Sequence, residues 1–333
     1  VSSNDDVLIE KVLLHISTLQ PFNYQLRELS LNIGCIVGAS NSSLEQDPHE
    51  LVNRAQQAVD TAIEHHKSHW MYKVASKGEE GRKVKMASEL QNAIEQNALE
   101  LFHQPQIDIK SRRVVGSEVL LRWTHPILGV VSPDEFVSVA ENTGLINRLS
   151  EWVFDTSCKH LKNLRERGIS SYRISVNFSA YDVMLGNFVA SLVEKINEYE
   201  LKADMFILEL TETVSVTDTR RFDNNLLELK ELGFHIAMDD FGAGYSNLQR
   251  MLQTPFDIIK LDVKLLARVP ADLWAASFYH QIIKLCSSKG CIIVAEGVET
   301  QLQSDFVRWA GVDLIQGFFF AKPTEHQPLM AQS

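Results

Sequence analysis

The sequence of 333 residues is poor in cysteine, has no long apolar run and carries no basic excess. Its four cysteines, Cys35, Cys158, Cys286 and Cys291, form neither a CxxC pair nor a zinc-type spacing with histidine. We expect buried free thiols in a reducing compartment rather than disulfides or a zinc site. No stretch of about 18 apolar residues offers a membrane span, and no signal peptide is visible.

The charge balance argues against one broad class of partner. Lys and Arg number 32 and Asp and Glu 43, a net charge of −11, whereas general nucleic-acid binders carry a basic surface. We expect no DNA partner, although one small anionic ligand can bind where metal ions offset the repulsion. Because the sequence starts at Val1 and not at Met, we expect a piece of a longer cytoplasmic protein, with a membrane anchor or sensory region upstream left open.

The first 80 residues have the pattern of a small α/β domain. A helical pattern over 7–19 leads to a strand-like segment over 29–39, and apolar residues at three- and four-residue spacing predict a long helix over 49–70. The charged stretch KGEEGRKVK, residues 77–85, is the best candidate for a solvated connector. The predicted division is an N-terminal α/β domain at 1–80, a linker and helix at 81–92, and a larger domain at 93–333.

In the larger domain, predicted strands and helices alternate. After a helical pattern at 87–96, two apolar runs at 99–109 and 114–123 are joined by a short polar turn and predict an antiparallel hairpin. Six more apolar runs follow, starting at residues 173, 205, 235, 257, 291 and 314, with amphipathic helices such as 220–233 between most of them. The eight strands predict an α/β fold, a (β/α)8 TIM-like barrel whose first strand is antiparallel.

Polar residues recur where these apolar strands should be buried or should end. They are Glu118, Asn177, Glu209, Asp239 with Asp240, Lys260 and Glu296. Any one such acid is more often a helix cap or a salt-bridge partner, and a single lysine there is more often a side chain that reaches out to solvent. Their recurrence in strand after strand instead favours a site at the C-terminal strand ends, where catalytic residues of this fold class collect. Five converging carboxylates would repel one another unless cations lie among them.

The ligand types predict the metal. Carboxylate and amide oxygens, with no cysteine or histidine, suit Mg²⁺ or Mn²⁺. Asp239 can bridge two ions about 4 Å apart, the arrangement used in phosphoester hydrolysis, while Asp240 holds the second ion. The glycine-containing segment 241–248 that follows can then close over a substrate.

Residues 90–325 resemble the EAL-domain family of cyclic di-GMP phosphodiesterases. The resemblance rests on QPQIDI, SEVLLRW, VNFS, ELTE, DDFGAGYSNL, KLD, AEGVET and QGFFFAKP, which occur in this order. It implies hydrolysis of cyclic di-GMP to linear pGpG by a water activated by two Mg²⁺ or Mn²⁺ ions, in a homodimer formed through the barrel. Two departures are Val119, where the signature has alanine, and Ala243, where threonine is frequent. We expect Val119 to point to the opposite face of its strand from Glu118.

The resemblance also implies a role for each matched residue. Glu118, Asn177, Glu209 and Asp239 match ligands of the first metal, and Asp239 and Asp240 match ligands of the second. Lys260 and Glu296 match the pair that orients and deprotonates the attacking water, while Glu212 and Glu299 match acids that hold the mobile loop. Arg122 matches a phosphate-binding arginine, and Gln104 and Gln316 match positions beside the substrate.

The N-terminal piece and the overall activity leave alternatives. Segments 29–39 and 54–70 resemble the closing half of a GGDEF diguanylate cyclase domain, but the GGDEF signature is absent, so this chain cannot make cyclic di-GMP. A spacer or dimerisation element is the alternative for residues 1–80. For the barrel, the alternatives to an enzyme are a receptor that binds cyclic di-GMP without hydrolysing it and a scaffold that binds protein or RNA.

Overall fold

The computed structural model describes residues 22–26, 29–33, 37–39, 51–56, 58–59, 69–71, 77–210, 219–242 and 254–325. Within these ranges the chain forms two compact units, Val1–Val84 and Lys85–Ser333. No helix among the described residues is long and apolar enough to cross a membrane. Three of the four cysteines, Cys158, Cys286 and Cys291, are described, and all three are buried free thiols, as predicted.

The first unit contains two short pairs of strands. β1 (Phe22–Leu26) is antiparallel to β2 (Leu29–Ile33), and β3 (Val37–Ala39) is parallel to β4 (His69–Met71). The predicted strand over 29–39 is therefore divided into β2 and β3. The prediction of a continuous helix over 49–70 was wrong at its end, because β4 occupies residues 69–71, although 51–56 are helical. The predicted helix at 7–19 lies outside the described residues.

The expected connector at 77–85 is part of a helix. α3 (Lys77–Glu95) contains that segment together with most of the helix predicted at 87–96. From residue 86 onward, Met86, Leu90 and Ala93 recur at helical spacing and are buried in a core cluster with Trp123 of the barrel. Burial of this apolar stripe explains why a helix is favoured over a solvated linker in this part of the sequence.

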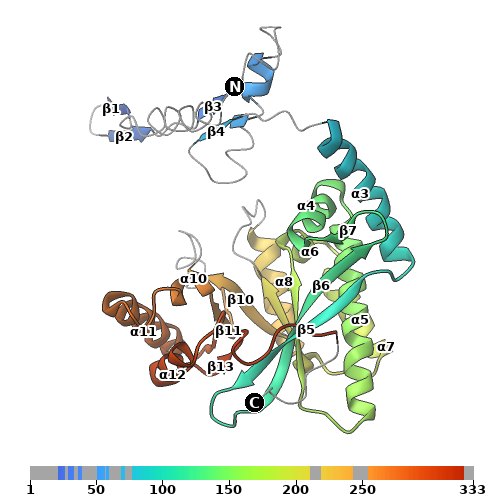
Figure 1. The fold of residues 1–333 in the computed structure, drawn as a ribbon, viewed down its shortest axis with the longest axis vertical. Helices are drawn as coiled ribbons and strands as arrows, with labels where there is room; N and C mark the ends of the chain where they lie inside the picture. Colours follow the sequence, from blue (N-terminus) through green and yellow to red (C-terminus); the bar gives the residue numbers. More distant parts are fainter. Residues whose placement is uncertain are drawn as a thin grey trace. The chain divides into compact units, whose positions relative to one another are not determined.

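Eight strands close the barrel of the second unit (Figure 1). They are β5 (Glu100–Asp108), β6 (Val114–His125), β8 (Arg173–Phe178), β9 (Phe206–Leu210), β10 (His235–Phe241), β11 (Ile258–Leu261), β12 (Ile292–Ala295) and β13 (Leu314–Ile315). β5 is antiparallel to both of its neighbours, β6 and β13, while the other pairs in the ring are parallel. The predicted TIM-like barrel with an antiparallel first strand is confirmed.

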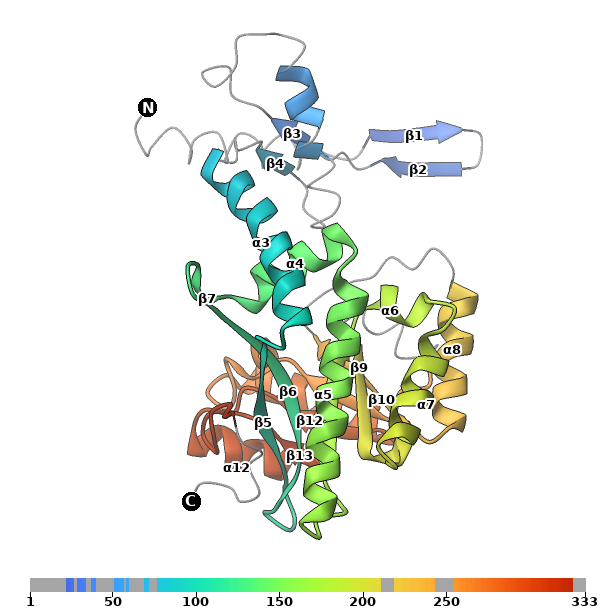
Figure 2. The same ribbon diagram turned by 90° about the vertical axis from the view of Figure 1, so that its right-hand side faces the viewer.

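Helices cover the outside of the barrel (Figure 2). They are α4 (Pro133–Thr143), α5 (Ile146–Glu166), α6 (Ala180–Met184), α7 (Phe188–Glu198), α8 (Thr219–Glu231), α10 (Val263–Leu266), α11 (Leu273–Ser288) and α12 (Gln301–Ala310). A 3-10 turn (Ala203–Met205) precedes β9, and the short strand β7 (Gly129–Val131) pairs antiparallel with the end of β6. The main core lies between strands and helices, where Phe154, Phe206 and Phe234 pack in series.

The last strand is shorter than the apolar run 314–321 predicts. β13 ends at Ile315, and the chain then turns. The backbone of Gly317 lies so close to Val298 that a Cβ would collide with its carbonyl oxygen, and the N–H of Phe319 donates to that oxygen (3.0 Å). Backbone bonding to the neighbouring loop therefore replaces continued strand pairing, and Gln316 is left at the mouth of the barrel.

Candidate active site

Five neighbouring strands bring polar side chains to one end of the barrel. Glu118 lies on β6, Asn177 on β8, Glu209 on β9, Asp239 and Asp240 on β10 and Lys260 on β11, while Glu296 directly follows β12. Because these strands are parallel and adjacent, their carboxyl ends meet at the same mouth. The structure thus brings these polar side chains together at one mouth of the barrel, as the strand pattern predicts.

The ammonium group of Lys260 lies among four carboxylates. Its Nζ atom is 2.6 Å from Glu209, 2.9 Å from Asp239, 2.9 Å from Glu296 and 3.1 Å from Glu118. The side chains of Lys260 and Glu209 are each only 1% exposed, so solvent cannot screen these charges. Four carboxylates against one ammonium leave an excess of three negative charges in a buried space, which is unfavourable without further cations.

The pKa values of the cluster reflect this excess. Burial, together with the charge of Glu118, raises the pKa of Glu209 well above its usual value although Lys260 opposes the shift. Burial likewise raises the pKa of Glu296 to about 8. Burial and the neighbouring charge of Asp239 raise the pKa of Asp240 to about 6. Burial would lower the pKa of Lys260, but the surrounding carboxylates outweigh it and raise that pKa.

The donor set fits divalent cations that prefer oxygen. Ligand oxygens of Glu118, Glu209 and Asp239 lie within 4.8 Å of one another, and so do those of Asp239, Asp240 and Glu296. Glu209 Oε1 is buried and has no hydrogen-bond partner among the described residues. Asp239 Oδ1 is within ion-pair distance of Lys260, but the pair does not have hydrogen-bond geometry. Asp239, the one acid that belongs to both groups, and buried oxygens that lack hydrogen-bond partners suit a pair of metal ions.

A bulge in β10 brings both adjacent aspartates into the site. In a regular strand Asp239 and Asp240 would point to opposite faces. Here the pairing of β10 with β11 shifts register between Met238 and Phe241, and Asp240 has a positive φ of 54°. Such a bulge re-aims a side chain at the cost of local backbone strain. Strand alternation alone does not predict this arrangement.

Two side-chain amides bind Glu118. Asn177 Nδ2 donates to Oε1 of Glu118 (2.8 Å), and Gln316 Nε2 donates to its Oε2 (2.6 Å). The positive charge of Lys260 and these two bonds outweigh burial, which raises the pKa of Glu118, and hold that pKa below its usual value. Glu118 is therefore held ionised, while the carbonyl oxygen of Asn177 stays available for a cation.

Arg122 stands beside a cavity at the edge of this cluster. Its guanidinium donates to the carbonyl oxygen of Leu121 (2.9 Å) and lies 5.6 Å from the ring centroid of Phe102. A largely apolar cavity of about 280 Å³ is lined by Arg122 and Asn177, and by α4 residues such as Val137. An apolar recess with an arginine and an amide at its rim suits a planar base attached to a phosphate.

Comparison with known proteins identifies the family. Residues 87–323 match the EAL domain. The chain belongs to the EAL domain family. Over 327 residues it is 30% identical to the bifunctional diguanylate cyclase/cyclic di-GMP phosphodiesterase MucR of Pseudomonas aeruginosa, covering 97% of this chain and 47% of MucR. It is 32% identical over 242 residues to the cyclic di-GMP phosphodiesterase NbdA of the same organism, covering 73% of this chain and 31% of NbdA. The chain thus spans less than half the length of either relative.

A solved structure supports the same family and fold. The structure of the MucR phosphodiesterase in complex with c-di-GMP superposes with a TM-score of 0.67 at 32% identity, covering 72% of this chain and 97% of that one. The barrel described above is therefore an EAL-type barrel in both its sequence and its fold.

Some predicted site residues of the EAL domain lie apart from the acid cluster or outside the described residues. Gln104 faces Glu118 across the β5–β6 pair but donates to the carbonyl oxygen of Ala321 (2.7 Å). Glu299 is exposed, and its backbone N–H donates to Gln303 (3.0 Å) at the start of α12. Glu212 and segment 243–250, with Ala243, lie outside the described residues. The roles predicted for these residues stay predictions.

Two positions near Glu118 add to the sequence-based interpretation. Val119 is buried in the main core behind β6, so its side chain lies on the opposite face from Glu118, as predicted. Gln106, which sequence reasoning missed, is buried inside the barrel and donates to Gln316 (3.2 Å) and Ser175 (3.2 Å). A second glutamine two residues after Gln104, on a strand buried on both faces, was the available signal.

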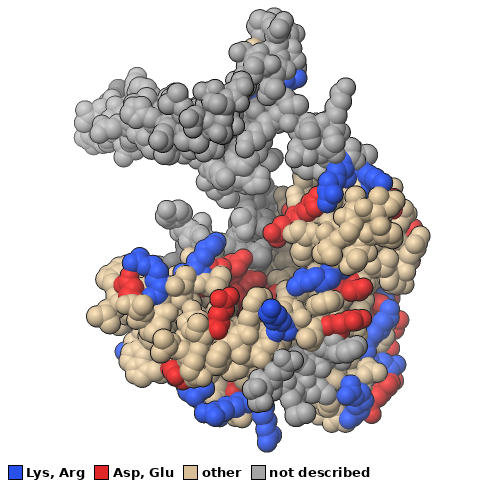
Figure 3. Space-filling model, in the orientation of Figure 1, with Lys and Arg blue, Asp and Glu red and all other residues tan. Residues whose placement is uncertain are grey.

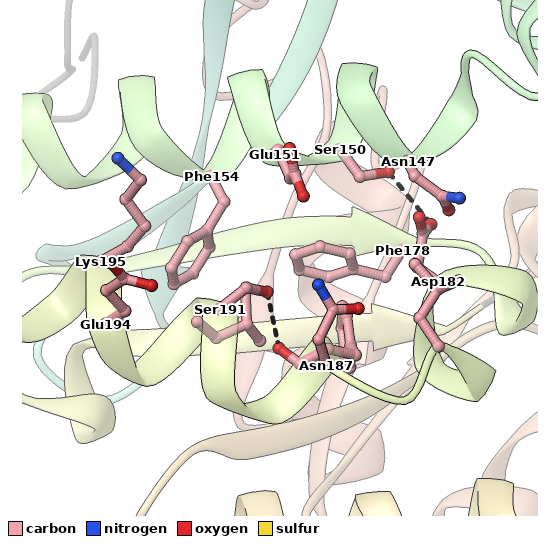
Figure 4. Close-up of a pocket in the computed structure, with 13 residues that line it drawn as sticks. Asn147, Ser150, Glu151, Phe154, Phe178, Asp182, Asn187, Ser191, Glu194 and Lys195 are labelled. Atoms are coloured by element: carbon pink, nitrogen blue, oxygen red, sulfur yellow. Dashed lines mark hydrogen bonds between the residues drawn. The ribbon is translucent and has the colours of Figure 1, made fainter.

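A separate cavity of about 280 Å³ lies outside the barrel between α5, α6 and α7 (Figure 4). Phe154 and Phe178 form its apolar part, and Ser150 donates to the buried carboxylate of Asp182 (3.0 Å). Asp182 also accepts from both the backbone and the hydroxyl of Ser179 in the capping box of α6. Asp182 is thus accounted for as a helix cap, and this cavity is distinct from the acid cluster of the EAL site.

Proposed function

We propose that the chain is a metal-dependent phosphodiesterase that hydrolyses cyclic di-GMP to linear pGpG. One observation carries the proposal: in an EAL-family barrel, four carboxylates surround Lys260 at the strand ends, with a fifth beside them in Asp240. Relatives named as cyclic di-GMP phosphodiesterases and a related structure in complex with c-di-GMP support the substrate. Neither a receptor nor a scaffold would explain why so many carboxylates are buried together.

The proposed metal ligands follow from the two groups of oxygens. Glu118, Glu209 and Asp239 would hold one Mg²⁺ or Mn²⁺ ion, and Asp239 with Asp240 the other, with Glu296 within the same distance. Asn177, which donates to Glu118, would complete the first set with its carbonyl oxygen. When bound, two such ions stabilise the negative charge on the entering and leaving oxygens of a phosphodiester hydrolysis. The ligand oxygens suit both metals, so the choice between them depends on supply.

The remaining residues bind the substrate, orient the attacking water and accept its proton. Lys260 donates toward the attacking water and fixes its position, and Glu296, its 2.9 Å partner, accepts the proton. Arg122 binds a phosphate oxygen through its guanidinium, and the cavity beside it takes one guanine. Gln104 and Gln316 lie on the substrate side, and Glu212 and Glu299 hold the loop that starts at Gly242. As the water oxygen bonds to phosphorus, the bond from phosphorus to the ribose 3′ oxygen breaks. The proton taken up by Glu296 passes to that 3′ oxygen, which leaves as a hydroxyl, and the product keeps the 5′ phosphate.

Hydrolysis of cyclic di-GMP tests this function directly. With Mg²⁺ or Mn²⁺ we expect pGpG to accumulate on chromatography and to disappear when EDTA removes the metal, because the two ions would stabilise the charge on the entering and leaving oxygens. Binding of cyclic di-GMP without product would instead assign a receptor. Neither binding nor product would leave a scaffold as the surviving interpretation.

We further propose that the barrel forms a homodimer near the segment that follows β10. The N–H of Asp262, directly before α10, donates to the carbonyl oxygen of Phe241, the last residue of β10 (3.2 Å), so α10 lies beside the end of β10, and α11 packs on α10. At the start of α11, Leu273 is 84% exposed and Trp274 73% exposed, and Trp274 stacks on Phe278. An exposed apolar group of this kind is typical of a subunit contact.

The oligomeric state in solution tests the dimer. We expect light scattering after gel filtration to give a dimer for the parent chain and a monomer for the Leu273→Ser, Trp274→Ser double variant. Trp309→Ser on α12, where the tryptophan is 69% exposed and stacks on His280, is the matched control and should stay dimeric. A monomeric parent, or a double variant that still dimerises, would contradict this interface.

The first unit and the cellular location are also proposals. We propose that residues 1–80 derive from a GGDEF domain. In support, the similarity to MucR, itself a bifunctional diguanylate cyclase/phosphodiesterase, extends over 97% of the chain and so beyond the EAL match at 87–323. The three buried free cysteines support a cytoplasmic location, where thiols stay reduced. An upstream sensory region stays a prediction.

Surface charge agrees with a small anionic substrate rather than a nucleic acid. On the face of the second unit shown in Figure 3, Lys and Arg side chains are interspersed with Asp and Glu and make no continuous basic surface among the described residues. Phosphate-backbone binders need such a surface. In the proposed function the positive charge that attracts phosphate comes from Arg122 and the metal ions.

A further inference from the structure

Gln106 lies deeper in the barrel than the acid cluster, on the strand that closes it. It stands two residues after Gln104 on β5, so both side chains project to the same face of that strand, the interior. Across the β5–β6 pair, Gln104 is opposite Glu118 and Gln106 is opposite Gly116. The side chain of Gln106 is 2% exposed in this interior. Burial of an amide there requires partners for its polar atoms.

The amide of Gln106 begins a chain of hydrogen bonds that ends on Glu118. Its Nε2 donates to Ser175 Oγ (3.2 Å) and to Gln316 Oε1 (3.2 Å), and Gln316 Nε2 in turn donates to Glu118 Oε2 (2.6 Å). Ser175 and Gln316 are buried, so water does not substitute for these bonds. The chain thus links β8, β5, the end of β13 and β6 across the interior of the barrel.

The direction of this chain is fixed by charge. Glu118 is an acceptor when ionised, so Gln316 must turn its NH₂ group toward it. Gln316 then presents its oxygen to Gln106, and only the NH₂ group of Gln106 can satisfy that oxygen. If Gln106 could not donate, Gln316 would lose the partner that holds its amide plane, and its oxygen could turn toward the carboxylate and repel it. Gln106 therefore controls which end of Gln316 faces Glu118.

We propose that Gln106 is a positioning residue of the metal site, which orients Gln316 so that Glu118 is held in the rotamer that binds the first metal ion. The inference rests on the proposed function. Hydrogen-bonded groups behind metal ligands typically change metal affinity by about 10- to 100-fold when they are removed. We expect a loss of this size for Gln106, although it touches neither metal nor substrate.

Manganese binding by the chain, measured by calorimetry without substrate, tests the inference independently of turnover. Gln106→Leu, which keeps the approximate volume but cannot donate, is expected to weaken Mn²⁺ binding about 10- to 100-fold. Gln106→Glu places an acceptor opposite Gln316 Oε1 and is expected to weaken binding more than leucine does. Gln301→Leu is the matched control, because it also removes one glutamine hydrogen bond, to Asp305 (2.8 Å), on exposed α12; its Mn²⁺ affinity should equal that of the parent.

A double variant separates positioning from general destabilisation. If Gln106 acts through Gln316, Gln106→Leu should cost no further Mn²⁺ affinity in a Gln316→Leu background, whereas independent effects would multiply. Thermal melting in EDTA checks that each variant is folded, and Gln106→Met serves in place of the leucine variant should that one fail to fold. Affinity within twofold of the parent for Gln106→Leu, or multiplying effects in the double variant, would overturn the inference alone. No Mn²⁺ binding by the parent chain would overturn the proposed function and this inference together.

Discussion

Glu118→Ala is expected to lower turnover of cyclic di-GMP by about 10³-fold or more while the barrel stays folded. Glu118 lies in the first group of ligand oxygens and is the carboxylate that both Asn177 and Gln316 support. Metal ions contribute several kcal/mol to transition-state stabilisation in such reactions, and each 1.4 kcal/mol is a factor of ten in rate. Loss of the ligand should therefore appear in both Mn²⁺ affinity and kcat.

The fold should survive this substitution because of how Lys260 is paired. After Glu118 is removed, Nζ still has Glu209, Asp239 and Glu296 within 2.9 Å, so the buried ammonium keeps its compensation. The side-chain amides of Asn177 and Gln316 lose an acceptor, which costs about 1–3 kcal/mol each when no other partner is found. The weaker repulsion among the remaining acids offsets part of that cost. Glu166→Ala, an exposed acid near the end of α5, is the matched control and should keep full activity. Turnover within tenfold of the parent for Glu118→Ala would remove Glu118 from the ligand set.

Much of the barrel and its acid cluster could be predicted because both follow from burial. Apolar runs of strand length that alternate with amphipathic helices leave few folds other than a barrel. An acid at the end of a buried strand needs a partner, so Glu209 and Lys260 could be inferred to meet although 51 residues separate them. The informative patterns have a common physical basis. Apolar runs must be buried away from water, and buried charged groups must have a partner.

Local backbone geometry and long-range amide partners were not predictable in the same way. The positive φ of Asp240, which turns two neighbouring acids into one site, depends on a register shift that no residue type demands. The chain leaves the sheet after Ile315 because Gly317 packs on the backbone of Val298, a contact with a distant loop. The polarity of Gln106 was visible in the sequence, but its partner Gln316 lies 210 residues away, and amides carry no charge that would predict their pairing.

Lys260→Met should make the stability of the barrel dependent on metal. Methionine is close to lysine in volume and flexibility but leaves Glu118, Glu209, Asp239 and Glu296 facing one another without a cation. Removing one partner from a buried ion-pair network costs about 3–5 kcal/mol, because the charges left behind are uncompensated. In EDTA we expect the free energy of unfolding to fall by about that amount, while hydrolysis is lost because the water is no longer oriented.

Added Mn²⁺ should then recover more stability in Lys260→Met than in the parent chain. The divalent ions replace the missing charge in the variant, whereas in the parent they bind a cluster that Lys260 already partly neutralises. Lys195→Met is the matched control: this lysine also pairs with two carboxylates, Asp155 (3.0 Å) and Glu198 (3.0 Å), but at the surface, where such pairs contribute about 0–1 kcal/mol. Denaturant unfolding of the three proteins with EDTA and with Mn²⁺ makes the comparison. Equal stability of Lys260→Met and Lys195→Met in EDTA would contradict this prediction. The four carboxylates would then not depend on the ammonium of Lys260, and their mutual repulsion would no longer be an argument for bound metal.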